Sequence, residues 1–301
     1  MSRLIKTYFG LLVMILGLTV FSCQSVTESP EQTKTSNFQL SDQFKQYWFD
    51  GKAEVSSYKL TQMRYGEARE GHAILIFVKE PFLENEQVKA NSASGKTVDV
   101  LKLNATKKFN TGIYPYSIMQ STFSPLSIDN HAVKVTASTQ EWCGQTYMQL
   151  NNREKFEITS HSYFEGEADQ KLDLDKTLLE NEIWTKLRVA PDQIKLGQQN
   201  VIPDFSYLRL KHKPINAYKT EITQKIIEDT LVTKIKYLEL PRVINIYQTK
   251  AFPYAILKWE EKTSENDEKF TQAVLQKQLK VDYWNKNSEA FSFLRDSLQL
   301  N

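Results

Sequence analysis

Short segments in which apolar and polar residues alternate fill the chain from about residue 53 to residue 281. In residues 133–138 the apolar side chains fall on one face and the polar ones on the other, as in a half-solvated strand. Residues 208–211 and 255–259 repeat this alternation. Further strands are expected at 54–65, 71–80, 97–104, 113–123, 145–150, 154–163, 215–226, 230–239, 242–249 and 269–281.

The connections between these segments are short. Asn151-Asn152, Glu228-Asp229 and Leu240-Pro241 leave no room for the crossovers that a parallel sheet needs. An antiparallel sheet of ten or more strands has to curl or close to deal with its edges. The pattern therefore predicts a mainly β fold, a large curved antiparallel sheet or an unclosed barrel, with an α+β arrangement as the alternative.

Helical periodicity occurs in three places, which predict two or three peripheral helices at 40–49, 174–188 and 286–298. Apolar residues share one face in each segment. Asp173 or Asp175 is a candidate N-cap for the second helix, and Ser288 is one for the third.

The N-terminal segment has the pattern of an export signal. Arg3 and Lys6 precede an apolar stretch over residues 8–21, and no acidic residue occurs before Glu28. A stretch of about 14 residues is shorter than the roughly 20 that a membrane span requires. Its length is that of the apolar region of a signal peptide.

Residues 19–23 end in Ser22-Cys23 and resemble a lipobox, the motif that bacterial lipoprotein processing recognises. Phe21 is bulkier than the usual occupant of its position. The resemblance implies a bacterial envelope lipoprotein that is cleaved before Cys23 and lipidated there, with palmitate among its expected acyl groups. A plain secretory signal or an uncleaved anchor is the alternative. Gln24 stands where inner-membrane retention usually has Asp, which favours the outer membrane.

These features divide the chain into a signal peptide at 1–22, a flexible tether at 23–37 and a β-rich envelope domain at 38–301. Residues 24–37 contain no Leu, Ile or aromatic residue and cannot offset the entropy of ordering. Several acyl chains on Cys23 bind a membrane much more firmly than one chain does. The membrane is therefore an expected partner, contacted through Cys23.

Charge and cysteine content exclude some functions. The chain has 38 basic and 36 acidic residues, and removal of Arg3 and Lys6 with the signal leaves equal numbers. This balance argues against nucleic acid as a partner. Only Cys143 remains besides Cys23, so the mature chain forms no internal disulfide. We expect Cys143 to be a buried small apolar residue, with a nucleophilic thiol as the alternative.

The common catalytic motifs are missing. The sequence has no Gly-rich phosphate loop, no Gly-x-Ser-x-Gly and no His-Glu-x-x-His. No cofactor and no metal site are predicted, since the four histidines lack ligand spacing: His72, His131, His161 and His212. Two groups of polar residues are expected in solvated turns: Glu165, Glu167 and Asp169, and Glu67, Arg69, Glu70 and His72.

Two features remain as candidates for binding. The aromatic residues of 47–49, with Tyr114, Tyr116 and Phe123, either line a groove or pack in the core. Gly144, in a segment of strand character, suggests a bulge or a close approach by another group. Residues 141–144 are therefore a first target for mutation, although the ligand-binding residues as such stay unknown.

Two weaker resemblances concern the mature part. The strand rhythm around 112–117 and 247–259 is similar to the unclosed barrels of envelope lipoprotein carriers, which implies a lipid-sized groove. Residues 47–54, 64–67 and 141–145 resemble lipoproteins that genomes label septum formation inhibitor Maf. True Maf nucleotide hydrolases carry Ser-x-Ser-Pro-Arg-Arg, whereas Glu31-Gln32 follow Ser29-Pro30 here.

Together these observations predict a membrane-tethered envelope lipoprotein with a non-catalytic binding or structural role. Its partner is expected to be an envelope protein, a lipid or a glycan. The alternative is a periplasmic hydrolase whose site is assembled from distant residues. That alternative requires Cys143 or a serine within about 3.2 Å of a histidine backed by a carboxylate.

Overall fold

The computed structural model describes residues 39–300. The predicted signal peptide, the tether and the lipidation site Cys23 lie outside the described residues. Within residues 39–300, no helix is long and apolar enough to cross a membrane.

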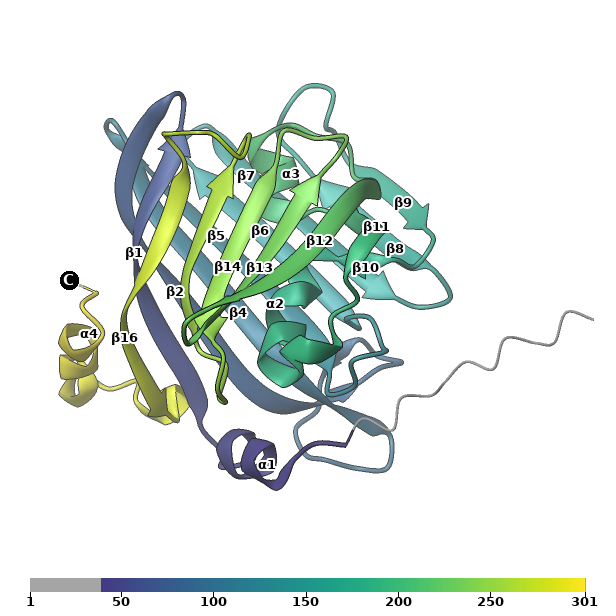
Figure 1. Ribbon diagram of the computed structural model, residues 1–301, viewed down its shortest axis with the longest axis vertical. Helices are drawn as coiled ribbons and strands as arrows, with labels where there is room; N and C mark the ends of the chain where they lie inside the picture. Colours follow the sequence, from purple (N-terminus) through teal and green to yellow (C-terminus); the bar gives the residue numbers. More distant parts are fainter. Residues whose placement is uncertain (1–38, 301) are drawn as a thin grey trace, which may run out of the picture. The chain divides into compact units, whose positions relative to one another are not determined.

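One sheet of sixteen strands forms most of the described chain (Figure 1). The strands of the first half are β1 (Ala53–Arg64), β2 (Glu67–Leu83), β3 (Val88–Lys89), β4 (Thr97–Thr111), β5 (Tyr114–Pro125), β6 (Lys134–Glu141), β7 (Gly144–Asn152), β8 (Phe156–His161) and β9 (Gln170–Leu174). Those of the second half are β10 (Leu178–Leu179), β11 (Gly197–Ile202), β12 (Tyr218–Ile227), β13 (Thr230–Tyr237), β14 (Val243–Thr249), β15 (Ile256–Lys262) and β16 (Thr271–Val281). The mainly β fold class is confirmed.

The order of strands across the sheet is β10-β11-β12-β13-β14-β15-β16-β1-β2-β4-β5-β6-β7-β8-β9, with β3 paired to β2. All neighbours are antiparallel except β10 and β11. The first long strand, β1, therefore lies in the interior of the sheet, where Ala53 pairs with Val281 of β16 and Glu54 pairs with Phe77 of β2. No hydrogen-bonded ladder joins the edges β9 and β10, so the sheet is curved but unclosed, as predicted.

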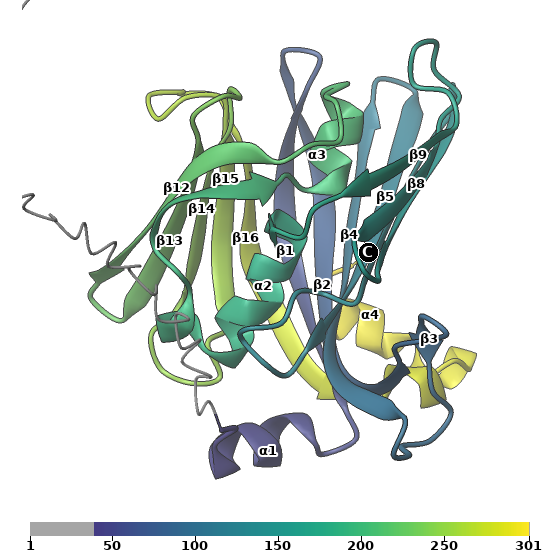
Figure 2. The same cartoon turned by 90° about the vertical axis from the view of Figure 1, so that its right-hand side faces the viewer.

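Four α-helices and three short 3-10 turns accompany the sheet. They are α1 (Asp42–Trp48), α2 (Glu180–Val189), α3 (Phe205–Leu210), α4 (Phe293–Ser297), η1 (Pro191–Gln193), η2 (Tyr283–Asn285) and η3 (Glu289–Phe291). Figure 2 shows α2 and α3 between the two flanks of the curved sheet. By contrast, Leu298 and Leu300, just after α4, belong to a cluster with Val55 on the outer face of the sheet.

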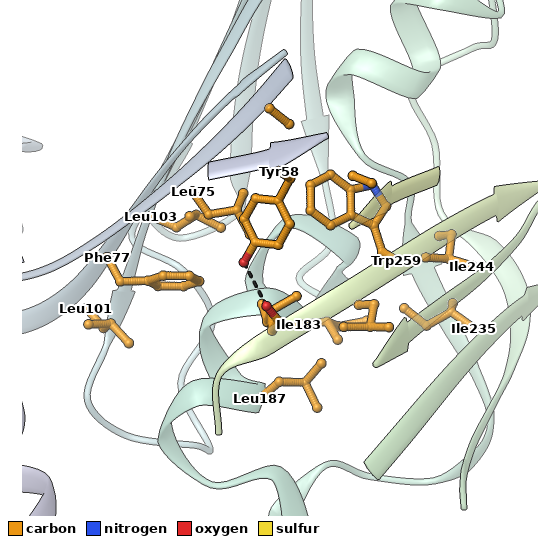
Figure 3. Packing of buried hydrophobic residues seen from close by; sticks show 14 of the residues in the cluster. Tyr58, Leu75, Phe77, Leu101, Leu103, Ile183, Leu187, Ile235, Ile244 and Trp259 are labelled. Carbon is orange, nitrogen blue, oxygen red and sulfur yellow. Dashed lines mark hydrogen bonds between the residues drawn. The ribbon is translucent and has the colours of Figure 1, made fainter. Parts of the chain in front are cut away.

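The main core fills the concave side of the sheet around α2 (Figure 3). Ile183 and Leu187 of α2 pack against inward side chains of the strands, among them Phe77 and Trp259. The Tyr58 hydroxyl of β1 donates a hydrogen bond of 2.9 Å to the carbonyl oxygen of Ile256 in β15, on the far side of β16. Every residue of α2 except Trp184 is buried, so this helix occupies the interior of the curved sheet.

Several predicted boundaries need correction. Residues 208–211 were expected as a strand, but 208–210 end the helix α3. All of α3 is buried, and in so short an apolar segment alternation does not distinguish a strand from a buried helix. The Asp204 carboxylate caps α3 by accepting a hydrogen bond of 3.1 Å from the backbone N–H of Tyr207.

The predicted helix 174–188 begins later than expected. Leu174 ends β9 and residues 178–179 form β10, so α2 starts at Glu180 with Leu179 as its N-cap, in place of Asp173 or Asp175. The segment 286–298 is helical only in η3 and α4, and Ser288 precedes η3 without a capping hydrogen bond from its side chain.

Candidate functional site: a basic cleft above a buried charge network

A cleft of about 90 Å³ opens at the end of the sheet that carries the β1–β2 and β15–β16 connections. Its walls are the end of β1, the helix α3 and the segment from Glu261 to Thr271. Lys107 of β4 and Arg242, just before β14, form its inner part. The strand order brings these distant segments together, because β1 and β16 are neighbours.

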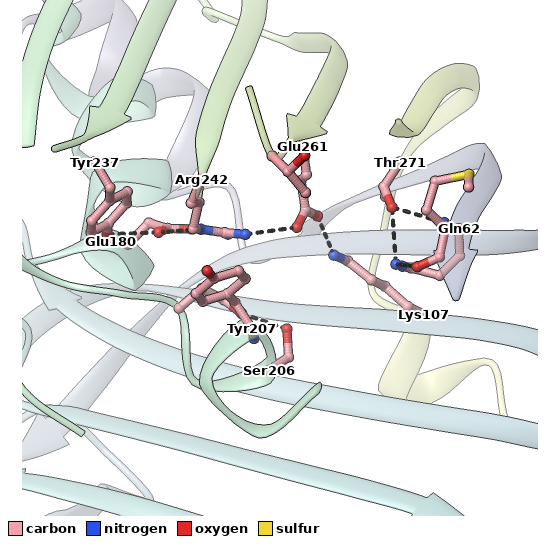
Figure 4. Close-up of polar contacts among 12 residues, drawn as sticks. Gln62, Lys107, Glu180, Ser206, Tyr207, Tyr237, Arg242, Glu261 and Thr271 are labelled. Atoms are coloured by element: carbon pink, nitrogen blue, oxygen red, sulfur yellow. Dashed lines mark hydrogen bonds and ion pairs between the residues drawn. The ribbon is translucent and has the colours of Figure 1, made fainter. Parts of the chain in front are cut away.

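A chain of ion pairs leads from this cleft into the interior (Figure 4). The Lys107 ammonium donates to Glu261 Oε1 at 2.6 Å, and Arg242 Nη1 donates to Glu261 Oε2 at 3.2 Å. Arg242 also donates to both carboxylate oxygens of Glu180, from Nη2 at 2.5 Å and from Nε at 3.0 Å. The Tyr237 hydroxyl donates to Glu180 at 2.8 Å and ends the chain.

Exposure falls along this network from the cleft inward. The Lys107 and Glu261 side chains are 15% and 18% exposed, whereas those of Arg242 and Glu180 are 4% and 1% exposed. Buried charges are tolerated when each is paired and hydrogen-bonded. The alternating signs meet this condition and fix the start of α2, which carries Glu180, to the sheet.

The network affects the pKa values of its carboxyl groups in opposite directions. Burial alone would raise the pKa of Glu261, but the charges of Lys107 and Arg242 outweigh it and lower the pKa to about 2. For Glu180, burial outweighs the attraction of Arg242 and raises the pKa. At neutral pH the outer carboxylate, Glu261, is therefore held firmly in its charged form.

A second polar group lies beside the first and joins α2 to α3. Asp204 Oδ2 accepts hydrogen bonds from Gln120 Nε2 at 2.7 Å and from Asn181 Nδ2 at 3.1 Å. A cavity of about 30 Å³ lies between this group, the Glu180 carboxylate and Trp184. Such a volume suits one or two water molecules and is too small for an acyl chain.

The sequence did not indicate these network residues as a site. One signal was available, because β4 continues past the predicted end at 104 and its alternation then places Lys107 on the inward face with Leu101 and Leu103. Likewise Glu261 lies two residues after the buried Trp259 of β15. A charged residue at an inward position of a strand indicates a buried partner.

The structure corrects the prediction for Cys143. The residue is exposed, in the two-residue turn between β6 and β7, because Glu141 and Gly144 pair across the end of the hairpin. A hydrogen bond to the Glu141 carboxylate raises the pKa of the thiol. Cys143 is thus neither a buried apolar residue nor an activated thiol.

The expected close approach at Gly144 is confirmed. A Cβ atom at this position would lie 2.9 Å from Cγ of Tyr163, whose ring covers the glycine. The aromatic candidates divide between core and surface: Trp48 and Tyr116 are buried, whereas Phe49 is exposed. Phe123 packs against Phe82 in a small separate cluster, with the two rings tilted by 41°. These rings therefore do not line a common groove.

Histidine and carboxylate pairs occur three times in the described chain. His131 Nδ1 lies 2.7 Å from Glu182, His161 Nδ1 lies 3.0 Å from Asp169, and His212 contacts Glu167. No serine hydroxyl and no cysteine thiol within residues 39–300 hydrogen-bonds to these rings. The same range contains no group of three or more His, Cys, Asp or Glu residues that could hold a metal ion. The geometry required of a Ser or Cys hydrolase is therefore not met in this part of the chain.

Comparison with known proteins bears on the fold only. No protein-family model matches the sequence, and no curated protein matches it significantly. The fold is similar to the crystal structure of a β-barrel-like protein of domain of unknown function DUF1849 from Brucella abortus. The two chains are 10% identical, the TM-score is 0.45, and the match covers 77% of this chain and 98% of the other.

Proposed function

We propose that this protein is a lipid-anchored component of the bacterial cell envelope that binds an external ligand without transforming it. The lipobox-like sequence before Cys23 supports the anchor, and the absence of Asp after it favours the outer membrane. The polar residues 24–37 then serve as the tether of the β-rich unit.

The observation that decides where a ligand can bind is the filled interior of the curved sheet. α2 and α3 occupy the concave side and are joined to the strands by buried ion pairs, so the cavity beside α2 measures only about 30 Å³. The cavity of about 280 Å³ beside α3 is lined in large part by polar and charged side chains, among them Glu167, Arg209 and His212. A carrier that encloses an acyl chain in its sheet needs a much larger apolar space. We therefore assign binding to the basic cleft at the end of the sheet.

The anchor is tested by metabolic labelling with an alkyne analogue of palmitate. The wild-type chain should incorporate the label and sediment with membranes, and Cys23→Ala should lose both properties. Cys143→Ala serves as the matched control, because it removes the other cysteine and should keep the label. Equal labelling of the wild type and Cys23→Ala would contradict the anchor.

A further inference from the structure

The lining of the cleft has a strong surplus of positive charge. It contains the six basic side chains Arg64, Lys107, Lys211, Arg242, Lys262 and Lys269 but only the two acidic side chains Glu261 and Asp267. Over the whole chain, basic residues outnumber acidic ones by only two. Positive charge is therefore concentrated at this cleft and does not reflect the composition of the protein.

The two carboxylates of the cleft are already engaged within the protein. Glu261 is bound between Lys107 and Arg242, as described above. Asp267 accepts hydrogen bonds from the backbone and side chains of Thr263 and Ser264, which lower its pKa. Within residues 39–300, neither carboxylate forms an ion pair with Arg64, Lys211 or Lys269 at the mouth of the cleft.

Four basic side chains of the cleft have no carboxylate partner within residues 39–300 or only a distant one. Lys211 and Lys269 are exposed and form no ion pair within residues 39–300. Arg64 donates only to neutral acceptors, the carbonyl oxygen of Leu210 at 2.7 Å and two tyrosine hydroxyls. The Lys262 ammonium lies 3.6 Å from Glu260.

Tyr207 provides a second, independent indication of a ligand. It lines the cleft and is only 6% exposed, yet its hydroxyl has no hydrogen-bond partner in the described chain. The Arg242 guanidinium lies over its ring, 4.0 Å from the centroid. A buried hydroxyl without a partner is unfavourable, and a ligand oxygen that accepted a hydrogen bond from it would remove this cost.

We propose that the cleft binds the phosphate group of a phosphate monoester. A group with two negative charges and three acceptor oxygens matches several uncompensated cations and a free hydroxyl donor better than a singly charged carboxylate does. Lys211, Lys269 and Arg64 contact the phosphate from the mouth, and Tyr207 donates from the wall. This inference names the ligand class for the binding role proposed above and rests on that role.

The test uses the full chain carrying Cys23→Ser, with glycerol 3-phosphate as the probe in isothermal titration calorimetry. Lys211→Glu/Lys269→Glu should weaken binding by at least about tenfold, the effect of losing two charge-assisted contacts. The matched control is Lys96→Glu/Lys225→Glu, which changes the net charge equally at exposed lysines outside the cleft. It should bind like the parent chain.

Tyr207→Phe separates binding from folding. Its hydroxyl makes no hydrogen bond in the described chain, so the midpoint of urea unfolding should stay the same or rise, while phosphate affinity falls severalfold. Binding that the cleft variant, its control and Tyr207→Phe all retain would overturn the proposal. So would the absence of binding to both glycerol 3-phosphate and phosphatidic acid vesicles.

Two sources of the phosphate are distinguished by sedimentation with phosphatidylcholine vesicles, prepared with and without phosphatidic acid. Cleft-dependent binding to the phosphatidic acid vesicles alone assigns the group to a lipid headgroup. Cleft-dependent binding to glycerol 3-phosphate alone assigns it to a soluble ester. Since this chain lacks the Cys23 thiol, these results are independent of palmitate labelling, and failure of the anchor leaves them unchanged.

Discussion

Arg188, near the end of α2, forms a doubly hydrogen-bonded ion pair with Glu54 of β1, with N–O distances of 2.6 and 2.7 Å. Both side chains are fully buried, and the guanidinium also lies over the rings of Trp48 and Phe77. Burial alone would raise the pKa of Glu54, but Arg188 outweighs it and lowers the pKa. This pair fixes the end of α2 to the first strand.

Glu54→Gln should therefore destabilise the protein by about 3 kcal/mol, because it leaves the Arg188 cation buried without its counter-charge. The double variant Glu54→Gln/Arg188→Met should recover part of this loss. Urea unfolding followed by circular dichroism measures both values. Glu70→Gln is the control, since its ion pair with Lys59 is exposed and should change stability by less than about 1 kcal/mol. Equal effects of Glu54→Gln and Glu70→Gln would contradict the structural role of the pair.

The lowered pKa of Glu261 predicts a specific dependence of stability on pH. Its folded-state pKa of about 2 lies below the ordinary value of 4.5, so its contribution is complete above pH 4.5 and is lost as the pH falls towards 2. The shift corresponds to about 3 kcal/mol. The difference in unfolding free energy between the wild type and Glu261→Gln should shrink across this range. A constant difference would show that the network does not hold the charge of Glu261.

Gly71 of β2 faces the neighbouring strand so closely that no side chain fits. A Cβ atom there would lie 2.1 Å from the carbonyl oxygen of Lys108 and 2.8 Å from Cβ of Phe109. Gly71→Ala should lower the unfolding free energy by more than about 2 kcal/mol, because β2 and β4 must separate. Gly95→Ala, with no atom within 4 Å, should change it by less than about 0.5 kcal/mol. Thermal unfolding of the two variants compares them directly.

Cys143 should react with a maleimide in the folded protein. In a chain with Cys23→Ser it is the sole thiol, and the exposed turn leaves it accessible. The reaction should be slow at neutral pH, because Glu141 raises the pKa of the thiol. Glu141→Gln should accelerate labelling, as followed by mass spectrometry. Labelling that occurs only after urea is added would mean that the turn is buried.

The strands were predictable because alternation is a local property that long hairpins repeat many times. Residues 54–65 and 269–281 were recognised in this way and correspond to β1 and β16. The alternation was misleading at 208–210, because all side chains of this short helix are buried. Neither the two-residue period of a strand nor the 3.6-residue period of a helix is then visible in the sequence. Alternation also could not identify the brief edge strand β10, which has only two residues.

The candidate site was much less predictable, because its residues come from segments far apart in sequence. Lys107 and Glu261 are 154 positions apart and meet only through the order of strands in the sheet. The even balance of charge argues against nucleic acid as a partner, but it says nothing about a single phosphate group. An average over the whole chain conceals the concentration of basic side chains that the fold produces at one cleft.

The place of β1 in the middle of the sheet has a consequence for how the protein folds. β1 pairs with β2 directly along the chain, but its other side is completed only by β16, more than 200 residues later. Such non-local pairing slows folding, and an unpaired strand edge invites association with other chains until its partner arrives. We therefore expect nascent chains to remain prone to aggregation, and to depend on chaperones, until residues 271–281 have emerged.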